Sequence, residues 1–209
     1  MGDAQCFLRI ILCKFKNKPK HLYTNVALIK HMLQKRNDLE IIELLRREPN
    51  HIRQIASVLN LIPSTVMRIL KNLQKEGIMD YNKEGKNNKY FLKETPETHI
   101  YIHMAEYYKL LKILQNVLLR RIIKELIKSS NGELIVIYGS YAKGSATNES
   151  DIDIYVETKD QKLKQELQKI SEKINIDIGK IDNNSALGKE IIKNHIIIQN
   201  PERFYQMIK

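Results

Sequence analysis

Apolar residues recur every three to four positions through residues 39–77, which is the spacing of one face of an α-helix. Pro49 interrupts the pattern, and Pro63 and Gly77 stand where helices commonly begin and end. Two short apolar runs then flank a turn rich in lysine and glycine, as in a β-hairpin. The pattern predicts three helices and two strands, over residues 39–48, 51–59, 63–77, 78–81 and 89–92.

Helical spacing returns after Pro96 and continues for about thirty residues. We expect one long amphipathic helix over residues 99–128, with two adjoining lines of apolar side chains. So much apolar surface requires cover. Either the flanking domains pack on this helix, or a second copy of the chain does, which would make a homodimer.

The last third of the chain alternates strand-like and helical patterns. Residues 134–137 form a short apolar run, and residues 151–156 and 174–178 alternate between polar and aliphatic side chains, as strands do. We predict an α+β fold, in which a small mixed β-sheet carries helices on one face. The expected parts are a basic extension, a helical domain with a hairpin, a linker helix and a sheet domain, at residues 1–38, 39–95, 96–130 and 131–209.

Carboxylates mark the polar side of the predicted sheet. Asp151 and Asp153 lie two positions apart on one strand, so their side chains point the same way, roughly 6 to 7 Å apart. Two such carboxylates repel unless a cation lies between them. Oxygen ligands favour Mg²⁺ or Mn²⁺, which carboxylates commonly share with substrate phosphates. Ahead of them, Gly139 and Ser140 form a turn whose backbone N–H groups and hydroxyl suit an anion.

A glycine and serine pair, ten residues and then Asp151-Ile152-Asp153 resembles the signature of the DNA polymerase beta nucleotidyltransferase superfamily, in its minimal nucleotidyltransferase branch. The resemblance covers residues 131–209. It implies catalysis and metal binding by three acids, with Asp177 as the third. It also implies that a nucleotide, ATP, binds near the Gly-Ser turn. The nucleotide-binding residues would be Gly139, Ser140, Lys143 and Ser150.

The resemblance implies transfer of a nucleoside monophosphate to a hydroxyl group, with release of pyrophosphate. Small relatives modify partner proteins, often a ribonuclease toxin encoded beside them, whereas others act on small molecules or RNA ends. The chain departs from the pattern at Tyr141, where an arginine is common. Two alternatives stay open: Asp177 as a solvated strand residue, and an inactive domain that keeps only the fold.

Residues 52–56, 64–66 and 73–78 resemble the winged helix-turn-helix of archaeal and bacterial regulators. The resemblance places the third helix on DNA, with Arg68 at a base edge and the hydroxyls and Lys71 on phosphates. The hairpin tip would add a further phosphate contact. The expected DNA-binding residues are Ser64, Thr65, Arg68, Lys71 and Lys86. The alternative is that this domain packs against a protein.

The charge distribution agrees with an acidic partner for the front of the chain. Residues 131–209 hold 11 Lys and Arg against 12 Asp and Glu, a net charge of −1, so residues 1–130 carry +12 and the whole chain carries +11. The sequence has no apolar run of about 18 residues, so we expect no membrane segment. Cys6 and Cys13 form no metal-binding or disulfide pattern, which favours the cytoplasm.

Two functions follow from these patterns. In the first, the protein is a metal-dependent nucleotidyltransferase of antitoxin type whose winged helix binds its own operator. In the second, it is a transcription regulator whose nucleotidyltransferase domain only senses nucleotide.

Overall fold

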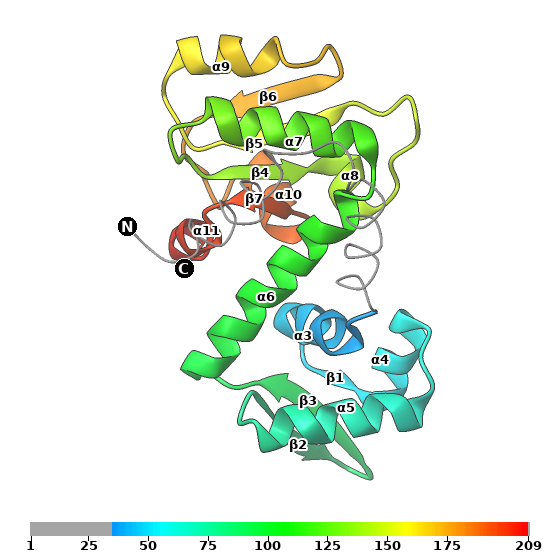
Figure 1. Ribbon diagram of the computed structural model, residues 1–209. Coiled ribbons are helices and arrows are strands. Elements are labelled where there is room, and N and C mark those ends of the chain that lie inside the picture. Colours follow the sequence, from blue (N-terminus) through cyan, green and yellow to red (C-terminus); the bar gives the residue numbers. More distant parts are fainter. Residues whose placement is uncertain (1–34, 209) are drawn as a thin grey trace, which may run out of the picture. The chain divides into compact units, whose positions relative to one another are not determined.

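The computed structural model describes residues 35–208, which form two successive regions (Figure 1). The expected basic extension at residues 1–38, with Cys6 and Cys13, falls almost wholly outside the described residues. The first region holds α3 (Asn37–Arg47), β1 (Asn50–His51), α4 (Ile52–Leu59), α5 (Pro63–Lys75), β2 (Met79–Glu84) and β3 (Asn87–Leu92). This region has the three helices and the hairpin that the apolar pattern predicts.

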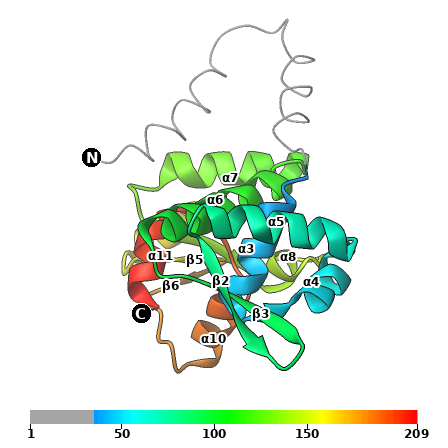
Figure 2. The same ribbon diagram turned by 90° about the horizontal axis from the view of Figure 1, so that it is seen from below.

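The helices of the first region share one buried core. Ile42 of α3, Ile55 of α4 and Leu70 of α5 are almost completely buried and belong to a single apolar cluster. The hairpin of β2 and β3 lies beside α5, which packs against β2 (Figure 2). The core therefore holds α5 with its polar side outward, as a recognition helix requires.

The sequence pattern did not predict β1. This strand of two residues pairs antiparallel with β3, with Asn50 opposite Tyr90, and makes the sheet three-stranded in the order β1-β3-β2. A strand this short shows no alternation of apolar and polar residues, so only its pairing with β3 identifies it.

The expected helix over residues 99–128 is two helices, α6 (Pro96–Ile113) and α7 (Val117–Ser129). Asn116 separates them, because its side chain accepts hydrogen bonds from the backbone N–H groups of Leu118 and Leu119, at 2.9 and 3.2 Å, and so caps α7. The two helices also differ in the cores that they contact. α6 packs Tyr108 into the core of the first region and Leu110 into the core of the sheet, whereas α7 packs on the sheet through residues such as Leu126.

The second region contains a four-stranded sheet in the order β6-β5-β4-β7. The antiparallel pairs are β4 with β5 and β4 with β7, while β5 and β6 run parallel, so the sheet is mixed as predicted. Its elements are β4 (Ile135–Tyr138), α8 (Gly139–Lys143), β5 (Ile152–Val156), α9 (Gln161–Gln168), β6 (Ile174–Ile178), α10 (Ala186–Lys193), β7 (Ile196–Gln199) and α11 (Pro201–Met207).

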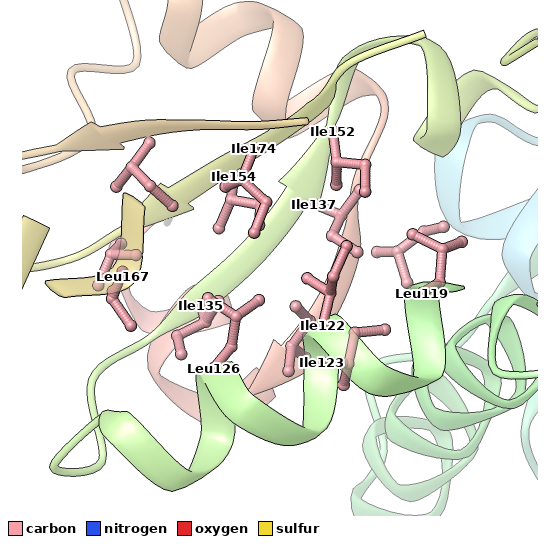
Figure 3. Close-up of a cluster of buried hydrophobic side chains, with 14 of the residues drawn as sticks. Leu119, Ile122, Ile123, Leu126, Ile135, Ile137, Ile152, Ile154, Leu167 and Ile174 are labelled. Carbon is pink, nitrogen blue, oxygen red and sulfur yellow. The ribbon is translucent and has the colours of Figure 1, made fainter. Parts of the chain in front are cut away.

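Helices cover both faces of this sheet, which corrects the expectation of one covered face. Side chains of α7 and α9 pack on one face, on Ile135, Ile137 and Ile154 (Figure 3). Ile191 of α10 and Phe204 of α11 pack on the other, with Val136. Every residue of β4 is buried, and a central strand with apolar residues on both sides needs cover on both.

A buried ionic cluster joins α6 to its surroundings. Glu106 of α6, with only 1% of its side chain exposed, accepts a hydrogen bond from Tyr205 of α11 at 2.5 Å and lies 3.2 Å from His195 Nε2. Lys109 Nζ lies 2.7 Å from the other Glu106 oxygen, and Arg46 of α3 lies 4.0 Å from the first. A single carboxylate thereby links α3 and α6 to the sheet region.

His195 contributes to this cluster through both ring nitrogens. Nδ1 faces the carbonyl oxygens of Ile191 and Ile192, at 2.9 and 3.1 Å, while Nε2 faces Glu106. His195 is 3% exposed, and its position in the fold is structural.

Within residues 35–208, no helix combines the length and the apolar character needed to cross a lipid bilayer.

We expect Glu106→Gln to lower the free energy of unfolding by about 3 to 5 kcal/mol, because the amide removes a buried negative charge and leaves Lys109 and Arg46 with Glu43 as their one nearby carboxylate among the described residues. Urea unfolding followed by circular dichroism measures this. Glu125→Gln is the control, since Glu125 pairs with the exposed Lys128 at 3.8 Å, and its loss should change stability by less than about 1 kcal/mol. Equal small effects would contradict a buried ionic role.

Stability should also fall in acid. Burial alone would raise the pKa of Glu106, but the hydrogen bond from His195 and the charge of Lys109 outweigh it and lower the pKa below its usual 4.5. At Glu43, Lys109 and Arg46 likewise outweigh burial and lower the pKa. The ionised carboxylates therefore stabilise the fold fully above pH 4.5, and this contribution disappears as the pH falls through the lowered pKa values. Urea midpoints from pH 7 downward should show a steeper acid loss in the wild type than in Glu106→Gln.

Candidate functional site

The turn from β4 into α8 brings the backbone against a carboxylate. Gly139 has a φ of 67°, in the left-handed region that glycine adopts without strain. A Cβ atom added at Gly139 would collide with Oδ2 of Asp153. Both the backbone angle and the contact therefore require glycine, and Asp153 lies directly beside the start of α8.

Register places Asp153 and Asp177 on one face of the sheet. Asp153 pairs with Tyr138 across β4 and β5, and Tyr155 pairs with Asp177 across β5 and β6. Paired residues share a face, and so do residues two apart on a strand. The two carboxylates and the Gly139 turn are thus brought together, as the sequence predicts.

Two side chains that the sequence analysis did not single out bind these carboxylates. The Tyr138 hydroxyl donates a hydrogen bond to Asp177 Oδ2. Asn175 Nδ2 lies 3.4 Å from Asp153 Oδ1. Both residues lie on the face of the sheet that carries the acids, and the alternation of side chains along the strands is consistent with this. Alternation alone does not show which neighbouring side chains touch.

The Tyr138 hydroxyl stays protonated. Burial, the hydrogen bond to Asp177 and the negative charges of Asp177 and Asp153 all raise the pKa of Tyr138. A neutral donor therefore lies among the carboxylates at neutral pH.

The remaining expected site residues lie apart from this group. Asp151 is exposed and precedes β5. Ser150 Oγ accepts a hydrogen bond from the Thr147 backbone at 2.9 Å and so closes a turn. Lys143 Nζ pairs with Glu190 Oε1 of α10 at 2.9 Å, and Ser140 is half-buried at the start of α8. Lys143 must leave Glu190 before it can meet a phosphate.

The three acids do not form a closed set of metal ligands. Within the part of the chain that the structure describes, no three His, Cys, Asp or Glu side chains are grouped so that they could hold a metal ion. Asp177 is bonded to Tyr138, and Asp151 lies outside the strand. A divalent ion still fits this chemistry, because Mg²⁺ usually takes one or two protein carboxylates and completes its shell with waters and substrate phosphates.

The residues expected to bind DNA lie on the outside of the first region. Ser64, Arg68 and Lys71 are exposed on α5, and Thr65 is half-buried. Lys86 is exposed beside Gly85, at the tip of the β2–β3 hairpin. These positions form two basic elements, a helix face and a hairpin tip, of the kind that a winged helix offers to DNA.

Comparisons with known proteins match both regions. The family model described as polymerase beta, nucleotidyltransferase matches residues 120–203, and the model described as bacterial regulatory protein, arsR family matches residues 37–81. No curated protein matches the chain.

Solved structures of regulators match about half of the chain. The adhesin competence repressor of Streptococcus pyogenes is 20% identical, with a TM-score of 0.37, over 51% of this chain and 83% of its own. A homodimeric winged helix-turn-helix DNA-binding domain from Mycobacterium bovis, described as a possible ArsR-family transcriptional regulator, is 19% identical, with a TM-score of 0.28, over 48% of this chain and 90% of its own.

The order of the two family matches is the order that the sequence motifs predict. The chain therefore contains an ArsR-type, DNA-binding helix-turn-helix followed by a nucleotidyltransferase domain of the polymerase beta superfamily.

Proposed function

We propose that the protein transfers AMP from ATP to a hydroxyl group of a partner protein and releases pyrophosphate. Residues 131–209 would carry the transfer site, residues 39–95 would bind operator DNA, and residues 96–130 would connect them. The observation that carries the proposal is the contact of Gly139 with Asp153, on the sheet face that also holds Asp177.

The contact matters because a triphosphate needs both an approachable backbone and nearby carboxylates. Gly139 has no side chain to keep a phosphate away, and the Ser140 hydroxyl can donate to one. Lys143, which is exposed, can exchange the carboxylate of Glu190 for a phosphate, so that one anion replaces another. These groups would hold the β- and γ-phosphates.

The acids serve the other end of the transfer. Asp151, Asp153 and Asp177 would hold Mg²⁺ or Mn²⁺, which stabilises negative charge on the phosphate oxygens when bound. Asp177 can accept the proton of the attacking hydroxyl through its carboxylate. Asp153, held against Gly139, keeps the acids close to the phosphate-binding turn.

The winged helix gives the transferase a second role. An exposed Arg68 and Lys71 on α5, with Lys86 on the hairpin, suit a duplex, and a homodimer would match two half-sites of an operator. An enzyme that also binds its own operator resembles an antitoxin that represses its operon, with a cognate toxin as the acceptor. We place this activity in the cytoplasm, where ATP and the operator meet.

The second candidate is a transcription regulator that senses nucleotide without transferring it. The Lys143–Glu190 pair and the ungrouped acids favour it, because both describe a site that is not assembled for transfer. The two candidates differ in whether a covalent product forms.

We expect Asp153→Asn to reduce transfer of label from α-labelled ATP by at least about 100-fold, because a carboxylate beside the reacting phosphate is lost. The assay uses purified protein, Mg²⁺ or Mn²⁺ and cell extract as the source of acceptor. Glu166→Gln is the control, since Glu166 is exposed on α9, on the opposite side of the sheet. No label on any macromolecule, with operator binding intact, would favour the nucleotide sensor.

We expect Arg68→Ala to weaken operator binding by about 10- to 100-fold through a lost base contact. Lys71→Ala should weaken binding to all duplexes and reduce the slope of log affinity against log salt by about 1. Fluorescence anisotropy with DNA from upstream of the coding region measures both. Lys169→Ala is the control, since this exposed lysine follows α9 in the other region. Unchanged binding in both variants would exclude α5 as the DNA-reading helix.

A further inference from the structure

Tyr138 is a buried side chain beside the two acids of the sheet, and the proposed reaction gives it no task. It is the last residue of β4, lies opposite Asp153 in the register and has 8% of its surface exposed. Its hydroxyl donates to Oδ2 of Asp177 on β6, two strands away. The ring thus spans β5, from the phosphate-binding turn to the third acid.

This hydrogen bond restricts Asp177. A carboxylate on a sheet face can otherwise rotate about its side-chain bonds, and each orientation presents its oxygens differently. A donor held in a buried ring selects one orientation and engages one of the two oxygens. Because the donor is a neutral hydroxyl, it orients Asp177 without cancelling the charge that a cation or an acceptor proton would need.

We propose that Tyr138 is a positioning residue, which holds the Asp177 carboxylate toward Asp153 and the Gly139 turn for nucleotidyl transfer. This inference rests on the proposed function. Tyr138 would touch neither substrate nor metal, and it would act through Asp177 alone. Its loss should therefore slow the transfer step more than it weakens ATP binding, which depends on the Gly139 turn and Lys143.

Tyr155 provides a matched control. It lies on the same sheet face, on the neighbouring strand β5, and is 2% exposed. Its hydroxyl donates to the carbonyl oxygen of Gly179 at 2.6 Å, so it too makes one hydrogen bond from a buried ring. A change to phenylalanine removes one hydroxyl in either case. Only in Tyr138→Phe is the lost hydroxyl one that donates to a carboxylate of the site.

The experiment compares Tyr138→Phe and Tyr155→Phe, with and without Asp177→Asn, in the full chain. We expect Tyr138→Phe to lower kcat by about 10-fold, because the hydrogen bond that orients Asp177 is lost. The KM for ATP should change by less than about 2-fold. Tyr155→Phe should change both by less than about 2-fold. In the Asp177→Asn background, Tyr138→Phe should cause no further loss, because the group it positions is gone.

Urea unfolding of the same variants tests the contact without activity. The midpoint shifts of Tyr138→Phe and Asp177→Asn should be strongly non-additive, because the two side chains share a hydrogen bond. Those of Tyr155→Phe and Asp177→Asn should be closer to additive, because the Tyr155 hydroxyl bonds to Gly179, although Tyr155 is the register partner of Asp177. Additive shifts for both tyrosines, equal kcat losses in both, or a Tyr138→Phe loss that persists without Asp177 would each overturn the inference. An active wild type whose kcat is unchanged in Tyr138→Phe would remove this inference alone. A wild type that transfers no label would remove the proposed function as well.

Discussion

The structure depends on keeping one buried carboxylate paired. Glu106 has 1% of its side chain exposed, and an ionised carboxylate in such a place is tolerated only with cations and donors around it. Its partners come from three other places in the fold: Arg46 on α3, His195 before β7 and Tyr205 on α11. Because no single element supplies them, α6 can hold Glu106 only when the elements around it are assembled. The same requirement joins the helix-turn-helix to the sheet region, although each region has its own apolar core.

The ionic cluster is also connected to the candidate site through the sheet. His195 directly precedes β7, β7 pairs with β4, and β4 ends at Tyr138 and Gly139. Two apolar faces hold β4 in place, and its last residues therefore have little freedom. A rigid strand is a good support for a turn that must bring Gly139 within contact of Asp153, since a small displacement would open the contact.

Much of the fold and the site followed from local patterns. Helical spacing and the positions of Pro49, Pro63 and Gly77 predicted the first three helices, since these signals depend on neighbours along the chain. The alternation of polar and aliphatic residues along the two strands placed Asp153 and Asp177 on the polar face of the sheet. The break at Asn116 was missed because apolar spacing continues across it. The cover on the second face of the sheet was not predicted. Which face α10 and α11 cover becomes visible only in the packing of Ile191 and Phe204 against Val136.

The sequence by itself therefore determined the order of the elements and the face of each strand on which the acids lie, because both depend on neighbouring residues. Tertiary structure alone decided which groups meet. Tyr138 with Asp177, Lys143 with Glu190 and Glu106 with His195 are pairs of residues 39, 47 and 89 positions apart. Such contacts depend on strand order and on the packing of helices on a sheet. No spacing along the chain encodes them.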